Sequence, residues 1–181
     1  NEDSAFIPCS PYAIAKLYAY WTTKLYRDTY GLHASNGILF NHESSLRPER
    51  FVTQKIVRGA RDISLGTLDC LRLGNLEVTR DWGWAPEYVD VMTRMLRRDQ
   101  AEDLVIATGR SVSLSYFVER AFRNFGLDWK QHVVTDAQFL RPSDIAYGAA
   151  NPSLAASKLG WTARHDVDFV IDAMCDALRP A

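Results

Sequence analysis

Short apolar segments alternate with longer amphipathic segments along this chain of 181 residues. Residues 103–109, "DLVIATG", form a compact apolar run. Residues 112–126, "VSLSYFVERAFRNFG", then place apolar side chains at helical intervals before a closing glycine. A short, continuous apolar run is typical of a buried strand, and a glycine commonly ends a helix. The repeated order of strand and then helix predicts an α/β fold.

The first helix that the sequence predicts has signals at both ends. Ser10 can cap it, and Pro11 suits the first helical position, where no amide hydrogen is needed. Gly31 favours the end of the helix after about Tyr30. The sequence therefore predicts a helix over residues 11–30.

The remaining elements are assigned from the same periodicity and from glycine and proline positions. We expect a short buried strand at residues 33–40, which leads into a polar loop at residues 41–49. Further helices are predicted at residues 50–65, 86–98, 151–161 and 166–178, and short strands around Gly74 and at residues 130–136. No repeat, low-complexity tract or linker divides the chain.

Composition and charge exclude several classes of function. Apolar residues make up 47% of the chain and charged residues 24%, as in ordinary globular proteins. The formal charge of -1 argues against nucleic-acid and membrane partners. Cys9, Cys70 and Cys175 are widely spaced and form no metal-binding pattern, which favours a reduced, cytoplasmic location. No apolar stretch approaches the roughly 18 residues of a membrane span.

Tyr12 and Lys16 form the first candidate pair for catalysis. Residues four apart share one face of a helix, so both side chains can enter the same cleft. A lysine ammonium favours the phenolate and lowers the pKa of a tyrosine toward the range of a general acid or base. Taken alone, the pair is weak evidence and fits a solvated helix face better, so the decision depends on the surrounding motifs.

These motifs resemble one family. "SPYAIAKLYAYW" is similar to the active-site helix of extended short-chain dehydrogenases. "FNHES", "RFVTQKI", "RDWG", "FLRPSD" and "NPSLAASKLGW" follow in order and resemble the GDP-mannose 4,6-dehydratase family from residue 1 to about residue 175. The resemblance implies the C-terminal part of an NAD(P)-binding Rossmann-type domain plus a small α/β substrate-binding domain.

A dinucleotide-binding fold needs a glycine-rich turn after its first strand. The ten glycines of this chain form neither GxGxxG nor GxxGxxG. We therefore expect a C-terminal portion that lacks the glycine-rich half. Residues 1–65 would close the cofactor domain, and residues 66–181 would mainly form the substrate domain, with some segments returning to the cofactor domain.

The resemblance also implies a reaction and its partners. The family oxidises C4 of GDP-mannose with NADP, eliminates water across C5 and C6, and returns the hydride to C6, giving GDP-4-keto-6-deoxymannose. This is lyase chemistry that serves GDP-fucose and GDP-rhamnose biosynthesis, with NADP preferred over NAD, in a parent enzyme that forms a homo-oligomer, a dimer or a tetramer.

The family's site positions map onto named residues of this chain. Tyr12 matches the base and Lys16 the ligand of the nicotinamide ribose. In the loop after the expected strand, Asn41 matches a substrate position, and His42 and Arg47 match NADP positions. Without its neighbours, His42 would fit a loop histidine satisfied by backbone.

The same loop and the later motifs supply the remaining matches. The family usually has two adjacent arginines in this loop, and here Leu46 replaces the first, which puts the cofactor contact between subunits in doubt. The nucleotide-binding matches are Val52, Lys55, Arg80, Arg141 and Asp144, the last in place of the family's usual glutamate. Guanidinium groups suit a diphosphate because they donate bidentate hydrogen bonds.

Alternatives remain open at the level of sequence. Another nucleotide-sugar dehydratase or epimerase of the same superfamily, for example one acting on a GDP-N-acetylhexosamine, would share these motifs. The chain by itself could instead be a non-catalytic fragment or assembly module. Because the family's Thr and Glu precede the Tyr12 helix, we expect the 181-residue chain alone to be inactive.

Overall fold

The computed structural model describes residues 1–140 and 143–179, and it confirms the first predicted helix. Helix α1 spans Pro11–Tyr30. The Ser10 side chain accepts a hydrogen bond from the amide of Ala13 at 3.0 Å, as an N-cap residue should. Gly31 ends the helix in the left-handed region with φ of 65°.

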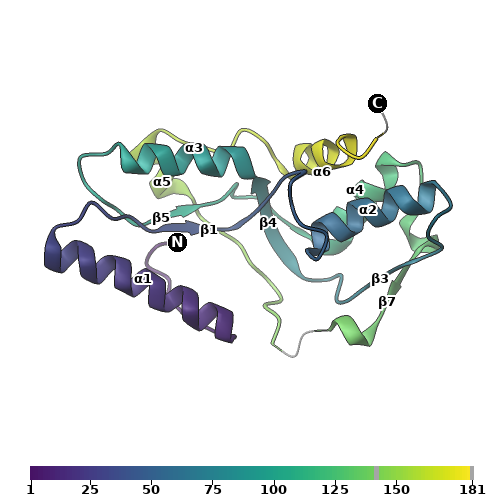
Figure 1. Cartoon of the computed structure of the whole chain (residues 1–181), viewed down its shortest axis with the longest axis horizontal. Helices are drawn as coiled ribbons and strands as arrows, with labels where there is room; N and C mark the ends of the chain where they lie inside the picture. The colour runs from purple at the N-terminus through teal and green to yellow at the C-terminus, as the bar shows by residue number, and fades with distance from the viewer. Residues whose placement is uncertain (141–142, 180–181) are drawn as a thin grey trace.

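Within the described residues, seven short strands form three small sheets, which confirms the α/β class (Figure 1). The first sheet pairs β1 (Gly37–Leu39) with β5 (Leu104–Ile106) in parallel. The second has the order β2 (Asn41–Glu43), β4 (Thr79–Trp84) and β6 (Ser111–Ser113), and the third pairs β3 (Leu71–Leu73) with β7 (Val133–Thr135).

The helices cover these sheets and build two separate clusters of buried side chains. After α1 they are α2 (Val52–Ser64), α3 (Ala85–Leu96), α4 (Leu114–Asn124), α5 (Ser153–Leu159) and α6 (Val167–Asp176), with short 3-10 turns at Trp129–Gln131 and Ala137–Phe139. One cluster joins α2, α4 and α6 to β3 and β4. The other joins β5, α3 and α5. None of the described helices combines the length and the apolar character that a membrane crossing requires.

Two predicted segments differ from the structure. Residues 41–43 were expected in a polar loop, but they form β2, which pairs in parallel with β4. Residues 111–113 form β6, antiparallel to β4, and α4 begins only at Leu114. Backbone hydrogen bonds to a distant strand stabilise both segments, so their own side chains need not alternate between apolar and polar.

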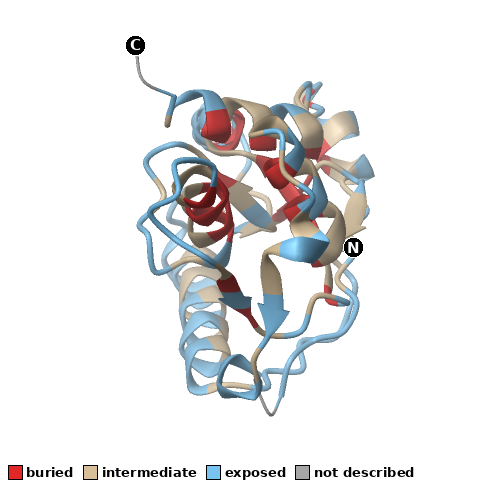
Figure 2. Cartoon of the chain, turned by 90° about the vertical axis from the view of Figure 1, so that its right-hand side faces the viewer, coloured by how far each residue is buried: buried red, intermediate tan, exposed pale blue. Residues whose placement is uncertain are grey.

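Helix α1 differs from the others because none of its residues is buried (Figure 2). A bidentate ion pair holds its last turns, in which the Arg27 guanidinium donates to both carboxylate oxygens of Asp103 at 2.7 and 2.9 Å. Asn36 adds hydrogen bonds from its backbone and side-chain nitrogens to the same carboxylate. These polar contacts hold α1 beside β5.

The division of the chain at residue 65 stays a prediction. The first cluster contains both Ile56 and Leu71, and the second packs Leu39 against Tyr88 and its neighbours. Each cluster therefore draws on residues from both sides of residue 65.

Candidate functional site

Tyr12 and Lys16 lie on the first turns of α1 and face solvent. The Tyr12 side chain is 73% exposed, and Lys16 is also exposed. The helix places the two side chains on one face, because they are four residues apart in a regular α-helix. Both groups can therefore reach a ligand that lies along this face.

The start of α1 contacts the segment that carries Asp144. The Ser143 hydroxyl donates to the carbonyl of Cys9 at 3.2 Å. Asp144 in turn accepts from the Arg80 guanidinium at 2.8 Å, where both side chains are partly exposed. Cys9 directly precedes the "SPYAIAKLYAYW" motif, and Arg80 and Asp144 belong to two other motifs, so the fold brings the three motifs together.

Asp81 supports this region from the other face of β4, because successive side chains of a strand point to opposite faces. Its carboxylate is fully buried and accepts from the Thr108 amide, the Thr108 hydroxyl and the Gly109 amide at 2.8 to 3.0 Å. Burial raises the pKa of Asp81, although these hydrogen bonds act in the opposite direction. The strand beneath Arg80 is thereby fixed to the turn after β5.

Lys55 is held against the residues that precede Arg141. Its ammonium donates to the carbonyl of Arg72 at 2.7 Å and lies 3.9 Å from the centre of the Phe139 ring. Burial lowers the pKa of Lys55, although Asp136 raises it. Lys55 and Phe139, the first residue of the "FLRPSD" motif, therefore share one surface.

Two other nucleotide ligands were predicted, Val52 and Arg141. Val52, at the start of α2, is 40% exposed and so can contact a ligand. Arg141 lies outside the described residues.

Asn41 and His42 occupy β2 rather than a loop. Asn41 is exposed, and the His42 ring stacks on the buried Tyr88 ring at a centroid distance of 4.9 Å. The Nδ1 of His42 lies 2.9 Å from the Phe40 carbonyl. Because a carbonyl only accepts hydrogen bonds, Nδ1 carries the proton, and Nε2 of the neutral ring is the acceptor that a ligand can use.

Arg47 lies in the loop between β2 and α2, between a carboxylate and an aromatic ring. Its Nε is 3.0 Å from a carboxylate oxygen of Glu43, and its guanidinium carbon lies 3.7 Å from the centre of the Phe51 ring. The same Glu43 oxygen accepts from the Thr53 hydroxyl at 2.9 Å. Burial raises the pKa of Glu43, while Arg47 and Thr53 lower it.

Reasoning from sequence missed Glu43, Asp81 and Tyr88, which support the predicted residues without facing a ligand. Asp81 directly follows Arg80 in the six-residue strand β4, where alternation places the two side chains on opposite faces. Glu43 directly follows His42 in β2, which has only three residues and is too short to show alternation. Tyr88 carries no such local signal, because its contact with His42 depends on the pairing of β2 with β4.

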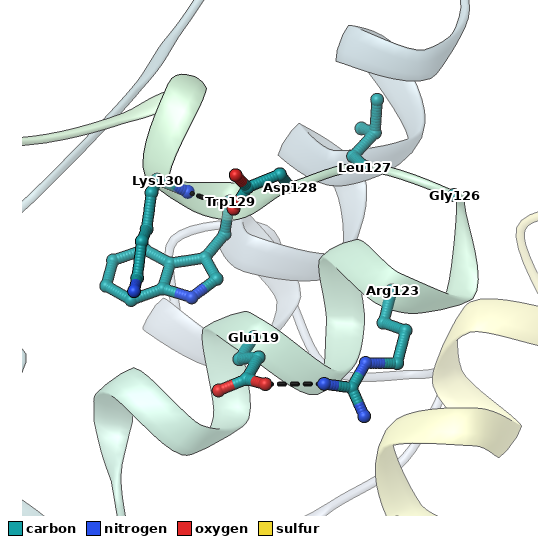
Figure 3. A pocket seen from close by; sticks show the side chains of 7 residues that line it. All are labelled: Glu119, Arg123, Gly126, Leu127, Asp128, Trp129 and Lys130. Atoms are coloured by element: carbon teal, nitrogen blue, oxygen red, sulfur yellow. Dashed lines mark hydrogen bonds and ion pairs between the residues drawn. The ribbon is translucent and has the colours of Figure 1, made fainter.

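A surface cavity of about 510 Å³ lies elsewhere, between the end of α4 and the following 3-10 turn (Figure 3). Its lining residues are Glu119, Arg123, Gly126, Leu127, Asp128, Trp129 and Lys130. Glu119 and Arg123 pair with each other at 2.6 Å across its floor. The cavity contains no predicted site residue, and its charged groups are already paired in part, so we do not assign the reaction to it.

The family model described as GDP-mannose 4,6 dehydratase matches residues 1–174. GDP-mannose 4,6-dehydratase of Sinorhizobium fredii (strain HH103) is 45% identical over 196 residues, which cover 99% of this chain and 55% of that protein. GDP-mannose 4,6 dehydratase of Homo sapiens is 42% identical over 194 residues, with coverage of 98% and 52%. The chain thus spans about half the length of the curated relatives it matches.

Solved structures show the same fold at low sequence identity. The NADPH complex of RMD from Pseudomonas aeruginosa has a TM-score of 0.86 and 18% identity, and the match covers 98% of this chain and 58% of that chain. The NAD complex of dTDP-glucose 4,6-dehydratase from Bacillus anthracis str. Ames has the same TM-score and identity, with coverage of 98% and 54%. The chain therefore has the fold of part of each of these two proteins. Together with the family match over residues 1–174, this places the chain in the GDP-mannose 4,6-dehydratase family.

Proposed function

We propose that this chain is part of a GDP-mannose 4,6-dehydratase, a hydro-lyase that converts GDP-mannose to GDP-4-keto-6-deoxymannose. The observation that carries the proposal is the meeting of three motifs at the start of α1. Cys9 contacts Ser143, and the neighbouring Asp144 pairs with Arg80. A base on the helix and ligands for a nucleotide thereby come within one region, as a nucleotide-sugar enzyme requires.

Tyr12 acts as the general base that takes the proton of the C4 hydroxyl. Lys16 lies one helical turn further along the same face, where its ammonium can reach the ribose of the nicotinamide. The ketone at C4 acidifies the C5 proton, and water then leaves across C5 and C6. When bound, the nicotinamide would accept a hydride from C4 and return it to C6.

The residues that would hold this cofactor fit a nicotinamide dinucleotide. Lys16 offers an exposed ammonium for ribose hydroxyls, and His42 offers Nε2 as a hydrogen-bond acceptor. Arg47 offers a partly exposed guanidinium for a phosphate. We propose NADP rather than NAD on the basis of the family's preference.

Arg80, Lys55 and Asp144 bind the nucleotide of the substrate. Lys55 is assigned to the guanine, and the two arginines Arg80 and Arg141 are assigned to the phosphates and ribose, since two arginines near a diphosphate are favourable in a partly desolvated cleft. The paired Asp144 can exchange its contact with Arg80 for a ribose hydroxyl when the diphosphate arrives, because both side chains are partly exposed. Asn41, Val52 and Arg141 complete the proposed substrate ligands.

We also propose that the full protein is a cytoplasmic homo-oligomer and that its product is used to form GDP-fucose or GDP-rhamnose. The second arginine of the family's loop is retained as Arg47, whereas the first is Leu46, which is 88% exposed. A cofactor contact between subunits would therefore rest on Arg47 alone, which favours a dimer over a tetramer.

The test compares wild type and Tyr12→Phe in the full-length protein, with formation of the 4-keto product from GDP-mannose as the readout. We expect turnover to fall by about 100-fold or more, since general acid–base catalysis contributes about 10²- to 10⁴-fold. The melting temperature should change little because the substitution removes only the hydroxyl group and keeps the ring. Near-normal turnover in the variant would remove Tyr12 from the mechanism.

Two further arms separate the alternatives. A GDP-linked N-acetylhexosamine assayed in parallel tests the choice of hexose. If it is turned over faster than GDP-mannose, it is the substrate and GDP-mannose is not. The 181-residue chain assayed alone should form no 4-keto product, because the glycine-rich turn is not among its residues. Steady product formation by the chain alone would contradict this expectation.

A further inference from the structure

Glu43 is a charged side chain that no step of the proposed reaction uses. It ends β2, and only 2% of it is exposed. A buried carboxylate is costly unless it is paired and hydrogen-bonded. Glu43 has both kinds of partner, because Arg47 approaches at 3.0 Å and the Thr53 hydroxyl donates at 2.9 Å. The Thr53 hydrogen bond fixes the carboxylate, and the carboxylate in turn holds Arg47.

The contacts of Arg47 leave it oriented but accessible. Glu43 contacts Nε, the inner nitrogen of the guanidinium, and Phe51 packs against the guanidinium plane at 3.7 Å. The outer nitrogens carry most of the N–H donors of an arginine. With 27% of its side chain exposed, Arg47 can present these donors to a ligand.

We propose that Glu43 is a positioning residue that fixes Arg47 in the orientation that binds a phosphate group of the cofactor. The proposal rests on the proposed function, in which Arg47 contacts NADP. A free arginine loses rotamer freedom when it binds, and Glu43 removes that cost before the ligand arrives. Glu43 therefore strengthens the binding of an anion even though it carries a negative charge itself.

The direction in which removal of the Glu43 carboxylate changes NADPH affinity distinguishes a positioning role from simple charge repulsion. On charge alone, removal of the Glu43 carboxylate should tighten the binding of an anion, because a nearby repulsive charge disappears. Under the positioning role, removal should weaken binding by about 2- to 10-fold, the cost of immobilising one flexible side chain. The two accounts predict opposite changes in the dissociation constant.

The experiment measures the dissociation constant of NADPH by fluorescence titration in the full-length protein. The Glu43–Arg47 contact is an ion pair in which the buried Nε of Arg47 makes no hydrogen bond, whereas Thr53 donates a hydrogen bond to the same carboxylate. Glu43→Met removes the charge and both side-chain oxygens, whereas Glu43→Gln removes the same charge and keeps one oxygen beside Arg47 and Thr53. We expect Met to weaken binding and Gln to recover part of the loss. Glu49→Gln is the matched control, since Glu49 lies in the same loop as Arg47, pairs with Arg58 of α2 and is exposed.

A spectroscopic readout on the 181-residue chain is independent of the cofactor. The Nε–Hε proton of Arg47 should be protected from solvent exchange in the wild type. This protection should be lost in Glu43→Met. Arg47→Ala should weaken NADPH binding in the full-length protein. If Arg47→Ala has no effect, the proposed cofactor role of Arg47 fails, and this proposal fails with it.

If Arg47→Ala weakens binding while Glu43→Met leaves it unchanged or tightens it, the positioning role alone is overturned. A melting curve shows whether Glu43→Met is folded. If it is not, the NADPH affinity of Glu43→Gln is compared with that of the wild type instead. Tighter binding in Glu43→Gln than in Glu49→Gln would also overturn the proposal.

Discussion

Gly83 gives room to a ring that supports His42. A Cβ atom at residue 83 would lie 2.4 Å from the Tyr88 ring, which is fully buried. Gly83→Ala should therefore force the ring to move, and overpacking of this kind costs about 1–3 kcal/mol. The free energy of unfolding from urea titration of the 181-residue chain measures the cost, and the His42 ring signals should shift as the stack is disturbed.

Gly148→Ala is the control for this prediction. Its added Cβ would meet the Arg80 side chain at 3.5 Å, an ordinary contact distance, so stability should change by less than about 0.5 kcal/mol. Equal losses in the two variants would show that the space over Gly83 is not the cause.

At the level of single residues, sequence reasoning reached the groups that face a ligand better than the groups that support them. Tyr12 and His42 stand in motifs whose residue types suggest chemistry directly. Asp81 was read only as part of the "RDWG" motif, because its partners at Thr108 and Gly109 lie far along the chain. The type of a residue reveals its own chemistry, but only the fold reveals its distant partners.

Among the elements, α1 and β5 are joined mainly by the carboxylate of Asp103. Burial raises the pKa of this group, but hydrogen bonds from Arg27 and Asn36 outweigh burial and hold the pKa below its usual range. A carboxyl whose folded pKa is lowered stabilises the fold above its ordinary pKa of about 4, and the contribution is lost as the pH falls through the folded value.

Asp103→Asn should therefore destabilise the 181-residue chain at pH 7 by about 1.5–3 kcal/mol, the range for hydrogen bonds to charged groups. The difference between wild type and variant should stay constant from pH 7 to pH 5 and shrink below about pH 4. Urea titrations at a series of pH values measure it. A difference that grows on acidification would contradict the lowered pKa of Asp103.

The helices were easier to predict than the strands for a physical reason. Ser10, Gly31 and Gly160 mark helix ends through contacts within a few residues, and the structure has caps at all three. Strands β2 and β6 depend on hydrogen bonds to β4, whose residues lie far away in sequence. Three-residue strands contain too few side chains to show alternation.

At the scale of the whole molecule, α1 is a long helix with little apolar support. Its exposed large side chains are Tyr12, Ile14, Tyr18, Trp21, Leu25, Tyr26 and Tyr30. Apolar residues on several sides of a helix normally predict burial. Sequence reasoning alone could not say that no residue of α1 would be buried, because burial depends on what packs around the helix and not on the pattern of the helix itself.

This difference predicts uneven stability across the molecule. Opening α1 exposes little additional apolar surface, whereas opening α2 would expose Ile56, Val57 and Ile63, which are buried. In the 181-residue chain, amide hydrogens of the first half of α1 should exchange on the order of 10- to 100-fold faster than those of α2. Hydrogen exchange followed by mass spectrometry of peptides measures both helices in one sample.

The same measurement on a protein of the relatives' full length distinguishes two causes. If α1 exchanges fast because its apolar faces lack a covering, additional chain should slow α1 while α2 stays the same, since the α2 core is already complete. If α1 frays for lack of intrinsic helix stability, its exchange should stay fast in both proteins. We expect the exchange of α1 to slow in the longer protein. Ser10 and Gly31 already cap both ends of α1, so the helix lacks packing partners rather than end caps.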